Sequence, residues 1–213
     1  MAVITISRQM GSQGCQVAEE IARCLNYRVV WREVINEAAS RAGVPEVALA
    51  TIDELDFLGL RPSADARKAY HQAVREIMIE LAREDNVVIV GRAGQVILRD
   101  WPGALHVRIY APLELRVEQI AKQHNEPLEA ARSQALASDK ARTQYLKRYY
   151  QSGWNDPDLY DVMINTAHFT IKAAALVVCK ALEQSTGAEA GKRAVKPSAK
   201  RAVKPSAQAE TSA

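Results

Sequence analysis

The sequence predicts an α/β fold in which a five-stranded parallel sheet carries helices on both faces. Five short apolar runs alternate with longer segments of helical spacing. These runs are continuously apolar, which is typical of parallel strands buried on both faces. The segments Gly11–Gln16, Gly91–Gln95 and Tyr110–Leu113 each follow such a run. In a parallel sheet they would meet at the carboxyl edge, where binding sites form.

The first part of the chain supplies two pairs of a strand and a helix. Strands are expected at Val3–Ile6 and Arg28–Trp31, and helices at Val17–Leu25 and Glu33–Arg41. Residues 46–61 contain apolar side chains without a clear period, so no element is assigned there.

The remaining chain continues the alternation. Asp65–Glu84 predicts an amphipathic helix, because Tyr70, Val74, Ile77 and Leu81 would share one face. Three more strands are expected, at Asn86–Gly91, Leu105–Tyr110 and Tyr160–Asn165. The further helices are expected from Pro112, over Pro127–Tyr150 and over Thr170–Gln184.

The composition is that of a globular protein, with 48% hydrophobic and 25% charged residues among 213. No signal peptide and no membrane-length apolar run is visible, so a cytoplasmic protein without membrane contact is expected. No metal site is predicted, because the cysteines and histidines lack ligand spacing. The histidines are expected at the surface or its boundary; the residues concerned are Cys15, Cys24, Cys179, His71, His106, His124 and His168.

The last residues, 187–213, differ in kind from residues 1–186, which are expected to form one domain. The segment Lys192–Ala199 is repeated without change at Lys200–Ala207. Such Ala/Lys/Pro repeats predict a disordered basic tail. The tail is either an electrostatic arm for nucleic acid or a solvated extension without specific partners. The folded part is not expected to bind nucleic acid, because its own charge is near −1.

The turn Ser7–Gln16 is the main candidate site. It joins a buried strand to a helix and contains two glycines, an arrangement that can hold phosphate on backbone N–H groups at the helix N-terminus. The alternative is a tight turn that binds no ligand. The residues expected to contact phosphate are Gly11, Ser12, Gln13, Gly14, Cys15 and Gln16.

Four segments, in order along the chain, carry a family resemblance. They are Ile4–Gly14, which reads ITISRQMGSQG; Val88–Gly94 with Val107–Arg116; Asp139–Arg142 followed by Tyr145, Tyr149 and Tyr150; and Trp154–Thr166. Together they resemble the cytidylate kinase-like family, a divergent branch of the P-loop nucleoside monophosphate kinases. The resemblance reaches from residue 3 to about residue 180. It implies a P-loop NTPase-like fold with a helical lid.

The resemblance also implies ATP and Mg²⁺ as cofactors and a small-molecule nucleotide as partner. Arg8, Arg142 and Lys140 would act on the transferring phosphoryl group, and Arg92 with Asp139 would hold the acceptor. A guanidinium suits phosphate because it pairs with two oxygens. The alternatives are an ion pair of Arg92 with a carboxylate such as Asp100, and a merely solvated charged helix around Asp139–Arg148.

The chain departs from active relatives at several positions. Gly14 stands where they have the phosphate-binding lysine, and Gln16 where they have the hydroxyl that binds Mg²⁺. Val90 and Ala93 replace the two aspartates beside the Gly-Arg pair, and Trp31 replaces an aspartate after the second strand. The chain therefore has fewer cations that could bind phosphate and fewer carboxylates that could bind the metal.

Two functions follow from these features. The first is ATP-dependent phosphorylation of a nucleoside monophosphate or a related small acceptor. The second is a catalytically degenerate kinase fold that binds nucleotide or phosphate as a regulatory module. The direction of the Arg8 guanidinium separates them: a guanidinium among the Gly11–Gly14 amides supports catalysis, and one directed elsewhere supports the module.

Overall fold

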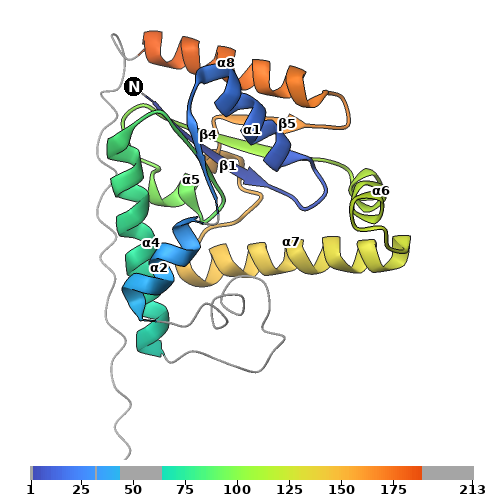
Figure 1. Ribbon diagram of the computed structural model, residues 1–213, viewed down its shortest axis with the longest axis horizontal. Helices are drawn as coiled ribbons and strands as arrows, with labels where there is room; N and C mark the ends of the chain where they lie inside the picture. Colours follow the sequence, from blue (N-terminus) through green and yellow to red (C-terminus); the bar gives the residue numbers. More distant parts are fainter. Residues whose placement is uncertain (1, 32, 44–63, 189–213) are drawn as a thin grey trace, which may run out of the picture.

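A five-stranded, entirely parallel sheet forms the centre of the protein (Figure 1). The structure, a computed structural model, describes residues 2–31, 33–43 and 64–188. The strands lie in the order β2 (Arg28–Val30), β3 (Val87–Val90), β1 (Val3–Arg8), β4 (Ala104–Tyr110) and β5 (Val162–Asn165). The predicted fold class is confirmed, and β1 lies at the centre of the sheet.

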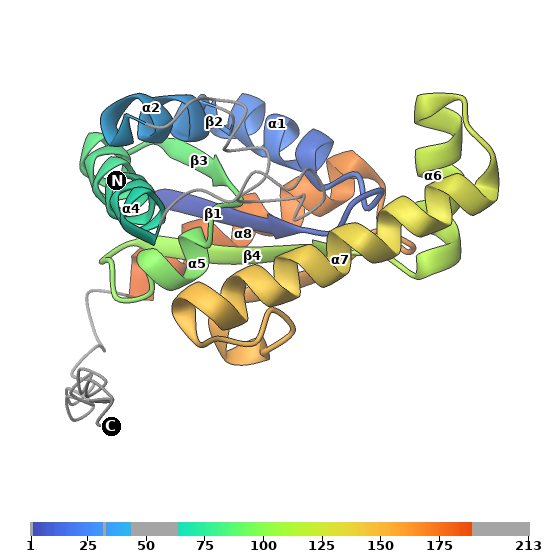
Figure 2. The same ribbon diagram turned by 90° about the horizontal axis from the view of Figure 1, so that it is seen from below.

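The helices lie on both faces of this sheet, as predicted. Helices α1 and α8 cover one face, and α4 with the short α5 covers the other, while α2 packs on α4 (Figures 1 and 2). Helix α7 runs past the carboxyl edge of the strands, as a helical lid would (Figure 2). Their bounds are α1 (Gly14–Leu25), α2 (Glu33–Ala42), α4 (Ala64–Glu84), α5 (Gly94–Ile97), α6 (Leu113–His124), α7 (Leu128–Tyr150) and α8 (Ile171–Ala188).

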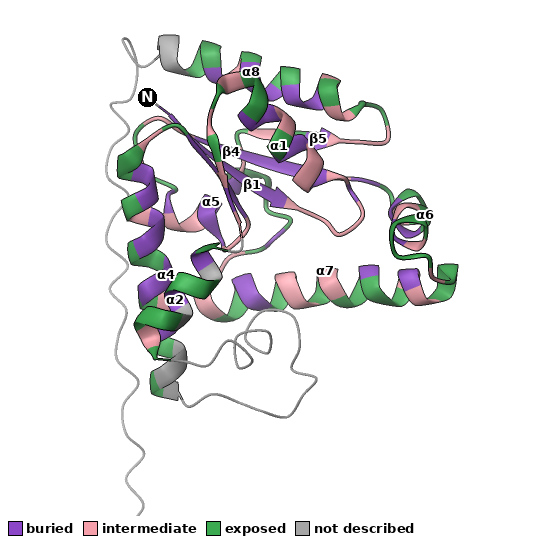
Figure 3. Ribbon diagram, in the orientation of Figure 1, coloured by how far each residue is buried: buried purple, intermediate pink, exposed green. Residues whose placement is uncertain are grey.

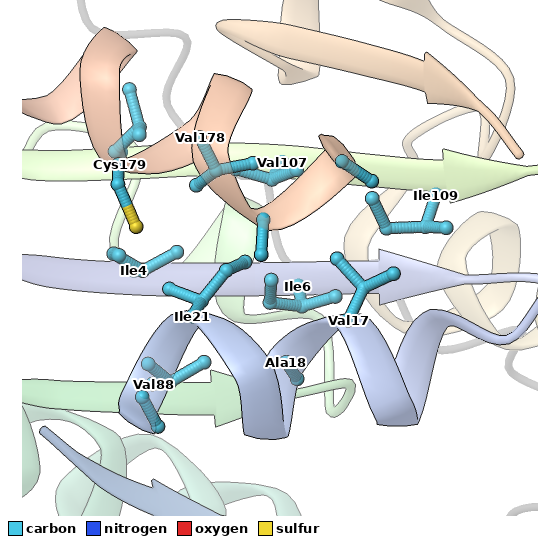
Figure 4. Packing of buried hydrophobic residues seen from close by; sticks show 14 of the residues in the cluster. Ile4, Ile6, Val17, Ala18, Ile21, Val88, Val107, Ile109, Val178 and Cys179 are labelled. Atoms are coloured by element: carbon cyan, nitrogen blue, oxygen red, sulfur yellow. The ribbon is translucent and has the colours of Figure 1, made fainter. Parts of the chain in front are cut away.

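The core between the sheet, α1 and α8 is made of aliphatic side chains (Figure 4). Ile4 and Ile6 of β1 pack against Val17 and Ile21 of α1, and all four are almost fully buried. A buried Ile side chain contributes roughly 1.5–3 kcal/mol to folding, so this contact fixes where α1 begins relative to β1. It therefore fixes the turn between them.

The opposite face is covered by α4, whose apolar stripe agrees with the predicted one. Tyr70, Val74, Ile77 and Leu81 are all buried against this side of the sheet. Helix α7 differs, because its residues are mostly exposed or half-buried (Figure 3). It is held by a few contacts at its ends and middle rather than by a continuous apolar face.

Several boundaries differ from the sequence-based expectation. Helix α1 begins at Gly14 rather than Val17, because Gln13 turns left-handed (φ 59°) and its carbonyl accepts the Val17 N–H. The short helices α5 and η2 (Pro157–Leu159) were not predicted, being too short for periodicity to show. Residues 46–61 and most of the tail lie outside the described residues, although α8 continues to Ala188. Among the described helices, none has the length and apolar character needed to cross a membrane.

Candidate functional site

The turn after β1 is packed onto β4 and α6. The Ser12 hydroxyl donates to the Gln9 carbonyl at 2.8 Å and lies 3.4 Å from the Ile109 carbonyl. Gly11 has a φ of +78°, and a Cβ built on it would lie 2.5 Å from the Arg116 carbonyl oxygen. Only glycine fits there. Gly11 thus allows the turn to pack closely on α6, and the buried Ser12 side chain stabilises the turn by its hydrogen bond.

The N-terminus of α1 forms the part of the turn that can receive an anion. Because Val17 donates the first helical hydrogen bond, to Gln13, the N–H groups of Gly14, Cys15 and Gln16 precede the bonded helix. The helix dipole favours negative charge at this place. Gly14 is buried, and a Cβ on it would lie 2.5 Å from the Arg8 Cβ. Cys15 and Gln16 are half-buried.

A buried arginine on α6 ties this turn to α7. Arg116, 3% exposed, pairs with the Asp139 carboxylate at 2.8 Å and also donates to the Ala111 and Met10 carbonyls at 3.2 and 3.3 Å. Gln9 completes the arrangement, since its amide accepts from the Ala111 N–H at 3.1 Å and lies 3.4 Å from Asp139. Asp139 therefore lies on the side of the turn, with its charge balanced by Arg116.

Arg8 leaves the turn in the other direction. A Cβ built on Gly91 would lie 2.7 Å from the Arg8 Nη1, so the guanidinium rests on the backbone that follows β3. Its Cζ lies 5.5 Å from the centroid of the Trp31 ring, beyond β2. The Arg8 charge is thus placed at the ends of β3 and β2, whereas Gly11 packs on the α6 side.

Arg92 lies close to Arg8 on this same side. It follows β3 in a left-handed conformation (φ 54°). Burial lowers the pKa of Arg92 to about 10; Tyr145 acts in the opposite sense, and the nearby charge of Arg8 lowers it further. Arg92 remains charged at neutral pH. Arg92 thus brings a second positive charge near that of Arg8, and a guanidinium can pair with two oxygens of a phosphate.

The C-terminal half of α7 brings aromatic rings to this region. Tyr145 lies 5.3 Å from Tyr149 and 5.8 Å from Tyr150, measured between ring centroids. Burial raises the pKa of Tyr145 and of Tyr150, which keeps both phenols protonated. The Arg142 Cζ lies 5.9 Å from the Trp154 ring. The tyrosines noted in the sequence therefore form one wall over the ends of the strands.

Trp154 is itself fixed by hydrogen bonds to the end of β1. Its indole Nε1 donates to the Ser7 hydroxyl at 2.9 Å, and its carbonyl accepts from the Tyr160 hydroxyl at 2.8 Å. Arg108 lies over the same indole, with its Cζ 4.3 Å from the ring. Ser7 of β1 thus positions Trp154, and Trp154 supports Arg142 of α7.

The structure divides the predicted site residues into two groups. One group lies at the turn and α6 and consists of Gly11, Gly14 and Asp139. The other lies at the ends of β3 and β2 and consists of Arg8 and Arg92. Arg142 lies beside Trp154, and Lys140 is exposed on α7. Arg92 and Asp139, both predicted to hold the acceptor, thus have different surroundings. Among the described residues, no group of three or more metal-ligating side chains exists.

Several residues of this site escaped the sequence-based reasoning. The partnership of Arg116 with Asp139 had no local signal, because the two residues lie on different helices. His106 was expected near the surface, which is wrong: it is 6% exposed in β4, with Nδ1 2.7 Å from the Thr5 hydroxyl. His71 lies against Tyr149, with ring centroids 3.9 Å apart.

The parallel sheet, the glycine turn before α1 and the helix over the strand ends are the features of the P-loop kinase fold. Comparison with known proteins gives the family. The sequence profile of the cytidylate kinase-like family matches residues 3–168, so the chain belongs to this family. The family resemblance that the four sequence segments predicted is confirmed.

Curated relatives cover most of the chain. A cytidylate kinase of Methanocella arvoryzae is 28% identical over 185 residues, which is 85% of this chain and 97% of the relative. A cytidylate kinase of Pyrobaculum aerophilum is 27% identical, covering 83% of this chain and 90% of the relative.

Solved structures agree with the fold. A protein of unknown function from Eubacterium ventriosum superposes with a TM-score of 0.67 at 21% identity, covering 86% of this chain and 99% of that chain. The shikimate kinase of Bacteroides thetaiotaomicron gives a TM-score of 0.53 at 12% identity, covering 85% and 98%. At these identities the likeness concerns the fold alone.

Proposed function

We propose that the protein transfers a phosphoryl group from ATP to a nucleoside monophosphate or a related small acceptor. The observation that carries the proposal is the turn before α1, where the N–H groups of Gly14, Cys15 and Gln16 precede the bonded helix in a chain of the cytidylate kinase-like family. Arg8 and Arg92, at the ends of β3 and β2, would add positive charge for the donor and acceptor phosphates. Membership of the cytidylate kinase-like family supports this class of substrate.

In this proposal each part of the chain has its own task. The N–H groups of Gly14, Cys15 and Gln16 bind donor phosphates, and Arg92 binds the acceptor phosphate. Arg8, whose side chain passes beside Gly14 and Gly91, neutralises charge as the phosphoryl group moves. Arg142, with Lys140, lies on the helix that covers the edge and excludes water.

Asp139 has a positioning task in this scheme, through Arg116 and Gln9. In the role that the sequence predicted for it, contact with the acceptor, the carboxylate is shared with Arg116. Its carboxylate is therefore placed to hold the turn in the state that the structure shows.

The two cofactors fit the structure unequally. The α1 N-terminus and Arg8 suit the phosphates of ATP. The described residues offer Mg²⁺ no cluster of carboxylates, and Asp139 is already paired with Arg116. Mg²⁺ does not need such a cluster, because the substrate phosphates commonly hold it together with only one or two carboxylates.

One observation favours the second function, a regulatory module that binds nucleotide without turnover. The Arg8 guanidinium rests on Gly91 and Trp31, on the side away from the Gly11 packing. Without a cation among the turn amides, the donor phosphates lose the charge that a P-loop lysine supplies. Binding then depends on the helix N-terminus and on Arg92.

A coupled assay of ADP release, run over several nucleoside monophosphates, separates the two functions. We expect turnover with at least one of them, and a fall of about tenfold or more in kcat for Arg142→Gln. The matched control is Arg99→Gln, an exposed arginine outside the site, with unchanged kcat. ATP binding by calorimetry without any turnover would refute the kinase and establish the module. Absence of ATP binding would refute both.

A further inference from the structure

Helices α1 and α8 pack against each other on one face of the sheet. The side of α8 that makes this contact is a stripe of buried residues spaced as i, i+3, i+4 and i+7. They are Ala175, Val178, Cys179 and Leu182. Figure 4 shows Cys179 in this stripe, with its sulfur directed toward the sheet. The face of α8 that packs on α1 therefore carries a thiol.

The last turn of α1 brings a second thiol to the same contact. Cys24 follows the buried Ile21 by three residues, so the two side chains are neighbours on the helix surface. The Cys24 side chain reaches the Cys179 thiol, and the two form a hydrogen-bonded pair. The charge of Lys180 acts on both sulfurs, which agrees with their lying together. The fold thus joins two thiols that are far apart in the sequence.

The two thiols differ in how an oxidant can reach them. Cys24 is exposed to solvent, whereas Cys179 is 2% exposed. Burial raises the pKa of the Cys179 thiol, and the hydrogen bond with Cys24 raises this pKa further. Because the thiolate is the form that reacts with oxidants, Cys179 by itself is protected. Cys24 is the sulfur that a small oxidant meets first, and Cys179 is the neighbour that can react next.

We propose that Cys24 and Cys179 are a modification site, which a peroxide converts to a reversible disulfide between α1 and α8. The Cys24 thiolate attacks one oxygen of hydrogen peroxide, the O–O bond breaks, and Cys24 becomes a sulfenic acid. The leaving hydroxide takes up the proton that Cys24 released and becomes water. The Cys179 sulfur then attacks the Cys24 sulfur, the S–O bond breaks, and the second hydroxide leaves with the Cys179 proton as water. The two sulfurs lose two electrons, which the peroxide gains, and a thiol reductant reverses the reaction by exchange.

The disulfide fastens α8 to α1 and closes a long loop of the chain. This loop contains β2, β3, β4 and β5, which are all strands of the sheet except β1. Closing a long loop stabilises a fold mainly by restricting the unfolded chain. Cys24 lies nine residues after Cys15, or about 14 Å along α1 from the turn that precedes this helix. The site is therefore separate from the turn, and the proposal does not depend on phosphoryl transfer.

Peptide mapping by mass spectrometry without reduction tests the pair. The full chain is reduced, freed of reductant, treated with hydrogen peroxide and alkylated. We expect a cross-linked pair of peptides that contain Cys24 and Cys179, within one chain as judged by non-reducing electrophoresis. Cys24→Ser, at an exposed position, should abolish the cross-link, whereas the matched control Cys15→Ser, at the other end of α1, should retain it.

Two results of this mapping would overturn the proposal. One is oxidation of Cys24 to a sulfinic acid while Cys179 stays a free thiol. The other is a cross-link between the Cys24 residues of two chains in place of the pair with Cys179. No nucleotide takes part in this measurement, so its outcome is independent of whether the protein is a kinase.

Thermal unfolding tests whether the disulfide fastens α8. We expect the oxidised wild type to melt about 5 °C or more above the reduced wild type, because the closed loop is long. The same peroxide treatment should leave the melting temperature of Cys24→Ser unchanged, which controls for oxidation elsewhere. Equal melting temperatures of the two wild-type forms would contradict the stabilising effect. A loss of ATP binding on oxidation of wild type, but not of Cys24→Ser, would refute a site separate from the turn.

Discussion

The middle and the C-terminal end of α7 border regions whose charges are arranged in opposite ways. On the side of the turn and α6, Arg116 is 3% exposed, and its charge is balanced by Asp139 and by backbone carbonyls. On the side of β3 and α4, Arg8 lies next to Arg92, and Lys68, Arg75 and Arg148 surround a hollow. The first side resembles a folded core, whereas the second gathers several basic side chains around a hollow.

This difference predicts different consequences of mutation. Where a charge is already paired within the protein, or a glycine packs closely against a neighbour, a substitution lowers the stability of the fold. Where cations gather for a ligand, the free protein carries unfavourable electrostatics, and a substitution costs binding while it stabilises the fold. Three variants, taken from the largest expected effect to the smallest, test this contrast.

Gly11→Ala should have the largest effect. The new Cβ would meet the Arg116 carbonyl at 2.5 Å and the Ile120 side chain at 2.9 Å, at a φ of +78°. We expect the free energy of unfolding to fall by about 3 kcal/mol or more, as measured by urea unfolding. The control is Gly43→Ala, which has φ +62° and no atom within 4 Å of the new Cβ. It should cost only about 1–2 kcal/mol of backbone strain. Equal losses would show that the packing of Gly11 on α6 is not required.

Asp139→Ala should have the next largest effect, because it leaves the buried Arg116 without its carboxylate. We expect a loss of about 2–3 kcal/mol in the free energy of unfolding. Adding Arg116→Met should restore at least half of it, since no unpaired charge then remains buried. Glu114→Ala is the control: it breaks the exposed pair with Arg132 and should cost less than about 0.5 kcal/mol. Failure of the double variant to recover would contradict the charge-balance explanation.

Arg92→Met should have a smaller effect of the opposite sign. Burial and the charge of Arg8 disfavour the charged form of Arg92, so its removal should raise the free energy of unfolding by about 1 kcal/mol at pH 7. Phosphate and nucleotide binding should weaken in the same variant.

The pH dependence checks the cause. The pKa of Arg92 in the folded protein, about 10, is lower than the ordinary arginine value. The unfolded chain therefore holds this proton to higher pH, and wild-type stability rises relative to the variant as pH rises through about 10. Urea unfolding of both proteins between pH 7 and about 10.5 measures the difference in free energy of unfolding between Arg92→Met and wild type, which should decrease as the pH rises. A difference that does not depend on pH would contradict the electrostatic explanation. The control is Arg99→Met, at an exposed arginine, which should have the same free energy of unfolding as wild type.

Much of the fold was accessible from sequence because its signals are local. The buried runs Val3–Ile6 and Val87–Val90, and the stripe of α4, each show their period within one segment. The position of the turn followed from the strand before it and the helix after it. The stripe Lys68, His71 and Arg75 was also readable, but only the position of α7 makes it the wall of a pocket.

Local periodicity and motifs in fixed order are enough to predict the parallel sheet, the glycine turn before α1 and the family. The pairing of Asp139 with Arg116, the direction of Arg8 toward Gly91 and the cationic hollow between α4 and α7 depend on how distant segments pack, and the sequence pattern does not show them. A side chain's partner is set by which distant segments the core brings together. Residue type alone does not tell whether a basic side chain is paired within the protein, as Arg116 is, or lines a hollow, as Arg148 does. Burial and the nearby charges at those contacts decide it.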